Sequence, residues 1–499
     1  MEQDQAVNHS AVLEMSSLAQ QYYERLRVIN ASPAAHRQTH AGEPSCVLIG
    51  RVVDMTRSQD EQEYDPHYVS IGPYHYRKDS PLAREDDKLQ HVEYVLAGGD
   101  ATANTLRPDD YQRYLTALEQ MDSRVRSCYT GRFPDMTVEE LAGMMLLDGC
   151  YILARFGHLG ESTASSTEDT PAISASAEEA VVAASNGALP VENESASTSV
   201  ASESRRRGDK QLVDVAMVRD VWYLEENQIP FFVVEEIHRL STGGTTSGAE
   251  RIARYARELL RPQLYSTAPP PQLEPPPGNL LHLLHMHMTS TTPRRDDGDG
   301  GRVARQRWRT VTEYSTAGVA FRPRDLAANP GCLLDVKLTN GGGTLEVPRL
   351  NADGETLRLL RNLTALEQHN AHAVGSRVTA YCMFLSQVAC TAGDVTLLSK
   401  VGILSHLMGN DKEVAGYFAD LCKGIVFDVD DPECNYLRST CRALEQRYQS
   451  RPRRWMAWLK QKHFRNPWVT VAVVAASLTL VCGLVQAVFA ILSYKNAKN

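Results

Sequence analysis

The chain has 499 residues, of which 42% are hydrophobic and 23% charged, and its formal net charge is -9. Eight carboxylates and no lysine or arginine lie between Glu161 and Ser204, which leaves -1 for the rest, so the composition excludes a basic nucleic-acid-binding protein. The ten cysteines include no Cys-x-x-Cys pair, which argues against a disulfide framework or a zinc site, and we expect them to be reduced, buried and structural.

The predicted elements begin after a variable N-terminal tail, residues 1–44. This tail lacks the basic and apolar regions of a cleavable secretory signal. In residues 45–160, the first half of a domain, "CVLIGRVV" predicts a short strand or a buried segment. The Gly-Pro step of "YVSIGPYHY" then ends any regular element, and helices follow. Thr137 and Glu140 predict a capping box at the start of one of these helices.

A linker over 161–209 is rich in Ser, Thr, Ala and Glu and is predicted to be disordered. The second half of the domain, 210–465, includes a helix that stops before Pro230 and a Pro/Gly-rich loop at about 262–307. The pattern of "CLLDVKLTNGGGTLEVPRL" predicts a β-hairpin, and helices follow to about residue 448. The expected fold is therefore mainly α-helical with a small β-hairpin, in a single large globular body plus one C-terminal transmembrane helix.

The anchor is predicted at 467–494, because no charge occurs from Trp468 to Tyr494 and a helix of this length would be about 40 Å long. The alternative is a buried core helix. The segment before the anchor is more basic than the segment after it, so we expect a tail anchor in the lipid bilayer of the plasma membrane or an endomembrane, with the body in the cytosol. The basic residues before it are Arg451, Arg453, Arg454, Lys460, Lys462 and Arg465.

Within the anchor, Thr479, Gly483 and Ala487 recur every four residues. Such a stripe of small residues could let two helices approach closely, which makes a homodimer one candidate assembly. The alternative is that small residues are simply common in membrane helices.

No catalytic or cofactor-binding motif is found, and no cofactor is predicted. The three glycines at 341–343 lack the Lys-Ser/Thr of a phosphate-binding loop and favour a tight turn. His282, His285 and His287 could offer imidazoles to a metal. Two of them are only two residues apart and cannot share one helix face, so a structural role is favoured over metal binding.

Several polar residues stand among apolar neighbours, where burial is costly unless they pair. They could act as catalytic acid-base groups, but an internal hydrogen-bond network that holds helices in register is the favoured interpretation. The stretch "YVSIGPYHY", residues 68–76, which we call the aromatic turn, is interpreted as a packing corner whose hydroxyl groups reach polar partners. The candidates for this network are Tyr74, His75, Asp148, Glu226, Asn227, Gln228, Arg361, Asn362, Glu367 and Gln368.

Several segments match a known pattern, and they include "YVSIGPYHYRKDSPLAREDDKLQHVEYVL", "MMLLDGCYILARF", "ENQIPFFVVEEI", "RNLTALEQ" and "GILSHLMGNDKEVAGYF". With these segments the chain resembles a plant family known as domain of unknown function 247, also called uncharacterised protein family 0481. The family usually has Leu where this chain has Glu225. The resemblance implies a plant membrane protein, from a grass, with no established enzymatic activity. Self-incompatibility is a minority alternative: grass members at two such loci are regarded as pollen-side recognition determinants, but most members have no assigned role.

Two functions follow from this sequence. The leading hypothesis is a membrane-anchored recognition or signalling protein without catalytic activity, which binds a protein or peptide partner. The alternative is a membrane-associated, hydrolase-like enzyme with Asp148 or Glu226 as acid-base group beside His75. In the enzyme these side chains would converge in an open pocket, and in the network they would be sealed against one another.

Overall fold

The described residues cover both halves of the domain and the C-terminal helix of the computed structural model. The N-terminal tail (1–44) and the linker (161–209) lie outside them, so the predictions for those segments are untested. The described ranges are 47–58, 60–77, 80–97, 108–157, 211–244, 247–292, 307–339, 341, 343–450 and 467–497.

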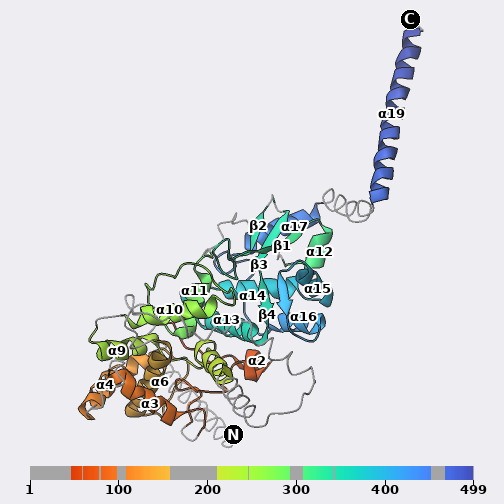
Figure 1. Ribbon diagram of the computed structural model, residues 1–499. Helices are drawn as coiled ribbons and strands as arrows, with labels where there is room; N and C mark the ends of the chain where they lie inside the picture. Colours follow the sequence, from red (N-terminus) through yellow and green to blue (C-terminus); the bar gives the residue numbers. More distant parts are fainter. Residues whose placement is uncertain are drawn as a thin grey trace, which may run out of the picture.

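The first half of the domain is built around helix α6 (Val138–Phe156). This helix begins with the predicted capping box, in which the Thr137 hydroxyl accepts from the Glu140 N–H and the Glu140 carboxylate accepts from the Thr137 N–H. Its apolar residues point in most directions, so it is surrounded by other helices. These helices lie together at one end of the molecule (Figure 1): α3 (Glu85–Leu96), α4 (Pro108–Gln120) and α5 (Asp122–Ser127) come from the first half, and α9 (Phe231–Thr242) and α10 (Gly248–Leu260) come from the second.

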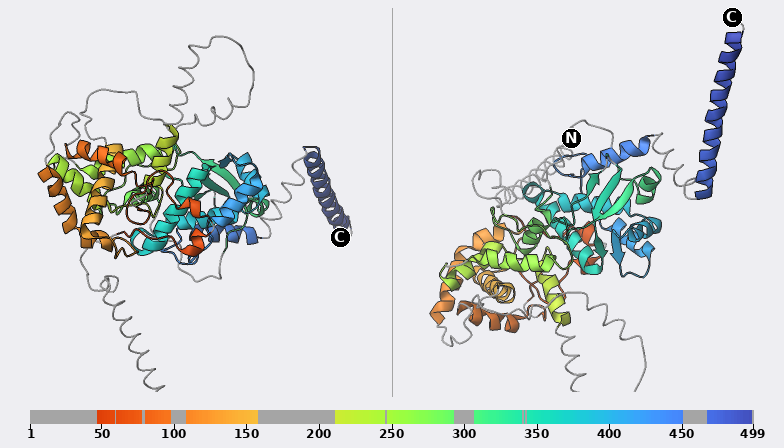
Figure 2. Two further views of the ribbon diagram at one scale, coloured as in Figure 1. Left: turned by 90° about the horizontal axis from the view of Figure 1, so that it is seen from below. Right: turned by 45° about the horizontal axis from the view of Figure 1, so that its top comes forward.

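The rest of the second half is built around α13 and α14, which pack together near the middle of the molecule (Figure 1). Helix α11 contacts both α10 and α13 and so joins these helices to the group around α6. The views in Figure 2 show the two groups of helices at opposite ends of the body. The helices of the second group are α11 (Leu280–Thr289), α12 (Val311–Thr316), α13 (Gly354–Val374), α14 (Arg377–Val388), α15 (Ala392–Lys400), α16 (Asp411–Asp420) and α17 (Arg438–Gln449).

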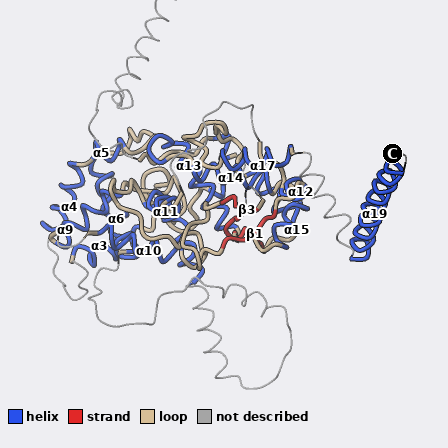
Figure 3. The backbone as a smooth tube through the Cα atoms, turned by 90° about the horizontal axis from the view of Figure 1, so that it is seen from above, coloured by secondary structure: helices blue, strands red, loops and turns tan. Residues whose placement is uncertain are grey.

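The predicted hairpin is present, with β2 (Lys337–Thr339) antiparallel to β3 (Thr344–Pro348). Strand β1 (Ala320–Arg324) adds to the other side of β3 in parallel. A second sheet of two short parallel strands pairs β4 (Leu350–Ala352) with β5 (Leu404–His406). Figure 3 shows how little of the body β1 and β3 occupy. The parallel pairs were not predicted, since their strands are distant in sequence and no turn marks the pairing.

One continuous apolar core runs through both halves and includes residues from Val47 to Leu444. Its largest fully buried side chains include Tyr151 in the first half and Trp222, Tyr381 and Phe384 in the second. The prediction of a mainly helical single body is therefore confirmed.

Of the two alternatives for the apolar run near Cys46, the structure shows the buried segment: its described part is extended and largely buried, with one isolated bridge between Ile49 and Tyr129 and no regular strand. One expectation needs correction. The cysteines are not all buried: the described ones are free, but Cys390 and Cys482 are exposed, because they lie at a helix junction and on the isolated α19.

Helix α19 (Pro467–Ala497) projects away from the body (Figure 1). Among the helices whose side chains are described, none is by itself both long enough and apolar enough to cross a membrane, and the apolar stretch Ala475–Ile491 of α19 is too short to qualify. Together α14 and α15 reach the required length and composition, but they are bent by 107° and most of their residues are not exposed. The transmembrane anchor thus remains a prediction.

Candidate functional site

The main polar cluster is centred on a turn that we call the EENQ turn, residues 225–228. A helix over 211–222 ends just before it, and Pro230 caps the next helix in an extended conformation. The chain between these helices is buried, and the four side chains of the EENQ turn are at most 1% exposed. Because a buried main chain needs hydrogen-bond partners, each of these side chains has a definable task.

Gln228 connects two helices. Its side-chain amide donates to the carbonyl oxygens of Val221 and Leu224, 2.9 and 3.0 Å away, at the end of the helix over 211–222. Its Oε1 accepts from the N–H groups of Leu280 and Leu281 at the start of α11, 3.1 and 3.3 Å away. One side chain therefore satisfies groups that the ends of two helices leave unpaired.

Asn227 and Asp220 hold the extended segment 67–72. Asn227 pairs with both sides of this main chain, since Oδ1 accepts from the Ile71 N–H at 2.7 Å and Nδ2 donates to the Val69 oxygen at 3.0 Å. Asp220 Oδ2 accepts from the first three N–H groups of the segment at 2.5–3.0 Å. Side chains thus replace the neighbouring strand that an extended segment normally requires.

Asp148 holds the end of the same segment. It accepts from the Gly72 N–H at 2.8 Å and lies 2.5 Å from the ammonium group of Lys88. Lys88 also donates to the Ser70 oxygen at 2.7 Å. Gly72 has a φ of +72°, and a Cβ there would lie 2.4 Å from the main-chain oxygen of Gln228. The Gly-Pro step is therefore required for the segment to approach the EENQ turn.

Glu225 and Glu226 hold the other extended segment, residues 48–52, which we call the strap. Glu225 Oε1 accepts from the Gly50 N–H at 3.0 Å, and Glu226 Oε1 accepts from the Val52 N–H at 2.9 Å. Glu225 occupies the position where the resembling family usually has Leu, and here it is fully buried. Burial raises its pKa to about 7.

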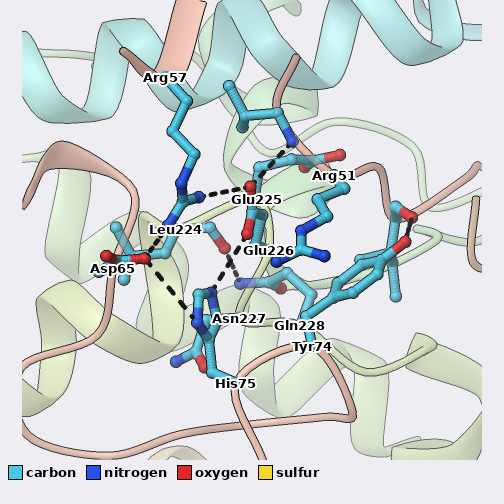
Figure 4. Close-up of polar contacts among 12 residues, drawn as sticks. Arg51, Arg57, Asp65, Tyr74, His75, Leu224, Glu225, Glu226, Asn227 and Gln228 are labelled. Carbon is cyan, nitrogen blue, oxygen red and sulfur yellow. Dashed lines mark hydrogen bonds and ion pairs between the residues drawn. The ribbon is translucent and has the colours of Figure 1, made fainter. Parts of the chain in front are cut away.

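His75 lies at the outer edge of the turn, between two carboxylates (Figure 4). Its Nε2 is 3.4 Å from Glu226 Oε2, and its Nδ1 is 3.9 Å from Asp65 Oδ1. Arg57 pairs with both carboxylates on the opposite side, at 2.7 Å from Glu226. Burial lowers the pKa of His75 to about 4 and raises that of Glu226. Chemically, this group could pass a proton between the two carboxylates.

Tyr74 forms the predicted packing corner. Its hydroxyl donates to the Ile49 oxygen at 3.1 Å and accepts from the Gly131 N–H at 2.9 Å. Its ring packs against those of Tyr129 and Phe133, with centroids 5.6 and 5.4 Å away. The aromatic turn thus connects the strap to the end of α5.

The α13 candidates lie in separate places. Asn362 joins the EENQ turn, because its Oδ1 accepts from the Glu225 N–H at 2.9 Å. Arg361 instead lies 3.8 Å from Glu63 and over the ring of Tyr417. Gln368 is half-buried and points to the surface, where it accepts from the N–H of residue 426.

Glu367 belongs to a different cluster, at the start of α14. Its carboxylate accepts from the Val378 N–H and from the N–H and hydroxyl of Thr379, at 2.7–2.9 Å. It also lies 2.7 Å from Nε2 of His285. These bonds assign Glu367 to the attachment of α11 and α14.

The three histidines of α11 are all buried. His282 Nδ1 accepts from the Gly278 N–H at 2.9 Å, and burial lowers its pKa to about 3. Within the described part of the chain, no group of three or more His, Cys, Asp or Glu side chains is arranged to hold a metal.

The proposed stripe of α19 lies on a helix whose described side chains are exposed in the single chain. The Thr479 hydroxyl donates to the carbonyl oxygens of Ala475 and Ala476 in its own helix. A Cβ on Gly483 would meet no other atom within 4 Å.

Several members of the cluster were missed from the sequence. A signal existed for Asp220, which interrupts the apolar run "MVRDVWYL" much as Asp148 interrupts its own. No comparable signal marked the other residues, because a charged or polar residue among polar neighbours in the sequence is expected at the surface. The missed residues are Arg57, Asp65, Lys88, Asp220, Glu225, His369 and Asn370.

The fold and this cluster define a mainly helical protein in which a buried polar turn holds two extended segments against the junction of its halves. The chain belongs to the DUF247 family, described as plant protein of unknown function, whose model matches residues 49–482. It is 24% identical to the UPF0481 protein At3g47200 of Arabidopsis thaliana over 92% of this chain and 89% of that protein. A second Arabidopsis UPF0481 protein, At3g02645, is 27% identical over 34% of this chain and 31% of its own length. No solved structure matches the chain.

Proposed function

We propose that this protein is a membrane-anchored recognition or signalling protein without catalytic activity, whose helical body binds a protein or peptide partner. The observation that carries the proposal is the use made of the buried acids. Asp148, Asp220 and Glu367 direct their oxygens at main-chain N–H groups of this same chain. A carboxylate bonded in this way has little capacity left for a substrate.

The anchor in this proposal is α19, a helix of 31 residues that would be about 46 Å long. Its uncharged run from 468 to 494 exceeds the thickness of a bilayer core, about 30 Å. The basic residues before it favour a body on the cytosolic side. The partner would then be an intracellular protein or peptide. Recognition of the self-incompatibility type is a narrower form of the proposal, which compatible self-pollination of a loss-of-function plant would support.

The alternative is a hydrolase-like enzyme, and one observation favours it. His75 Nε2 and Glu226 Oε2 face each other at 3.4 Å, and neither atom has a hydrogen-bond partner among the described residues. Such a pair could act as an acid-base couple at the outer edge of the cluster. Against it, Glu226 Oε1 is already bonded to the strap and to Arg57.

Stability and turnover of two variants separate these functions. Asp148→Asn leaves the buried Lys88 without its counter-charge and should lower the free energy of unfolding by about 3 kcal/mol. Glu226→Gln should also lower the melting temperature, because Arg57 loses its buried partner. The control Asp109→Asn, at an exposed position, should change stability by less than about 0.5 kcal/mol.

The full chain in detergent would be tested against chromogenic ester, peptide and glycoside substrates. Turnover that Glu226→Gln abolishes at an unchanged melting temperature would contradict the proposal and support the enzyme. Lower melting temperatures for both variants, with no turnover attributable to Glu226, would support the proposed binding protein.

A further inference from the structure

The strap is fastened at two neighbouring residues by two different elements. The Gly50 N–H donates to Glu225 Oε1 of the EENQ turn at 3.0 Å. The next carbonyl oxygen, that of Arg51, lies 3.1 Å from Nε2 of His369 on α13. Glu225 and His369 also face each other, with 3.7 Å between Oε1 and Nδ1. Glu225 and His369 therefore each bond the strap and also contact one another.

The hydrogen bond to Arg51 fixes the tautomer of the histidine. A carbonyl oxygen can only accept, so Nε2 of His369 carries the hydrogen. A neutral ring then presents the bare lone pair of Nδ1 to the Glu225 carboxylate. Two acceptors that face each other, here Nδ1 of His369 and Oε1 of Glu225 at 3.7 Å, repel. A single added proton, on either group, converts this contact into a hydrogen bond.

The surroundings make it costly for Glu225 to be ionised while His369 is neutral. Glu225 is 0% exposed, and its neighbour Glu226 is a second buried carboxylate. Tyr74 from the aromatic turn also faces this part of the cluster, and burial and the charges of both glutamates raise the pKa of its hydroxyl. Burial raises the pKa of Glu226, and the positive charges of Arg57 and Arg51 oppose this rise. Asn362 accepts from the Glu225 N–H. Because the two arginines act mainly on Glu226, an ionised Glu225 depends on His369 for its counter-charge.

The strap fits closely over the histidine ring. A Cβ on Gly50 would lie 2.0 Å from His369 Nδ1, so only glycine allows the strap to close here. Because the ring and Gly50 are in such close contact, a change in the position of the ring displaces the strap.

We propose that Glu225 and His369 share one proton that fastens the strap over residues 48–52, and that loss of this proton as the pH rises through neutrality loosens the strap. This shared proton is independent of the proposed function. It would let a change in pH expose or release the N-terminal part of the domain.

The direction of the pH effect follows from the two groups. Burial raises the pKa of Glu225 from 4.5 to about 7. Burial alone would lower the pKa of His369, but the adjacent Glu225 carboxylate raises it above its usual 6.5. A group whose pKa is raised on folding contributes stability that is present below its unfolded pKa and lost as the pH rises through the folded pKa. For this pair the loss extends through about pH 7.

His75 acts in the opposite sense at lower pH. Its pKa is lowered to about 4, so its contribution is lost as the pH falls from 6.5 through 4. Measurements between pH 6.5 and 8.5 therefore report mainly on Glu225 and His369.

Hydrogen exchange of the strap in the full chain, in detergent, tests the proposal. After correction for base-catalysed intrinsic exchange, protection of the 48–52 amides should fall by up to about tenfold per pH unit between pH 6.5 and about 7 and level off above that, since opening releases a proton only while the closed pair still holds one. In Glu225→Gln the amide oxygen still accepts from Gly50 and the amide N–H₂ donates to His369, so protection should be independent of pH. The control His372→Gln, an exposed histidine on the same helix, should retain the profile of the unmodified chain.

Parallel profiles in Glu225→Gln and the unmodified chain would overturn the proposal. If the variant does not fold, the unmodified chain alone decides, because protection that does not change between pH 6.5 and 8.5 contradicts a proton-dependent strap.

Discussion

Gln228 occupies a position where an apolar side chain would leave the Val221 carbonyl and the N–H groups of Leu280 and Leu281 unpaired. The site has no access to water, since the residue is 1% exposed. Its contribution to stability therefore lies less in the bonds it forms than in the desolvation cost that would appear without them. The same argument applies to Asn227, which bonds both an acceptor and a donor of the 67–72 segment.

Replacing Gln228 by Leu should therefore lower the free energy of unfolding by at least about 3 kcal/mol, because each unsatisfied buried group costs about 1–3 kcal/mol. Urea denaturation of the full chain would measure this change. The control Gln446→Leu, at an exposed position on α17, should shift stability by less than about 0.5 kcal/mol. Equal effects of the two substitutions would show that Gln228 is not needed to connect the helices.

At the scale of elements, helices with capping signals and a strong apolar pattern were predictable, and pairings between distant segments were not. The capping box of α6 and the β2–β3 hairpin follow from local sequence. The parallel pairs of β1 with β3 and of β4 with β5 join segments that no local pattern relates.

The cluster shows the same limit. The sequence pointed to Asp148 and the residues from Glu226 to Gln228 because they interrupt apolar runs. It did not reveal that their partners are main-chain groups of the strap and the 67–72 segment, since a bond between a side chain and a distant main chain leaves no pattern. Arg361, Glu367 and Gln368 lie near Asn362 in sequence, yet the structure separates them from the EENQ turn, because successive residues of α13 point in different directions.

Helix α19 carries the prediction of self-association. If its Thr479, Gly483 and Ala487 stripe lets two copies approach closely, Gly483→Leu should reduce the fraction of cross-linked dimer in detergent severalfold, because the larger side chain separates the helices. Val485→Leu, on the opposite face, serves as the control and should leave dimers unchanged. Dimers that persist in Gly483→Leu would remove this stripe as the contact.

The whole molecule combines a single helical body, a continuous core and a helix that stands apart from it (Figure 1). The body uses its buried acids to hold its own extended segments, and the proposal of a binding protein rests on this use. The proposal of a membrane anchor rests on the separate apolar helix. Together these features make the position of the body relative to the membrane the central question.

Protease accessibility of the full chain in sealed plant microsomes, with a tag before Met1, tests this most directly. The account predicts that the chain sediments with the microsomes, that added protease removes the tag, and that Asn193, within an Asn-Glu-Ser glycosylation sequon, carries no glycan. A chain ending at residue 466 should stay in the supernatant. Full-length protein in the supernatant would contradict the anchor, and a protected tag with a glycan on Asn193 would contradict the cytosolic body.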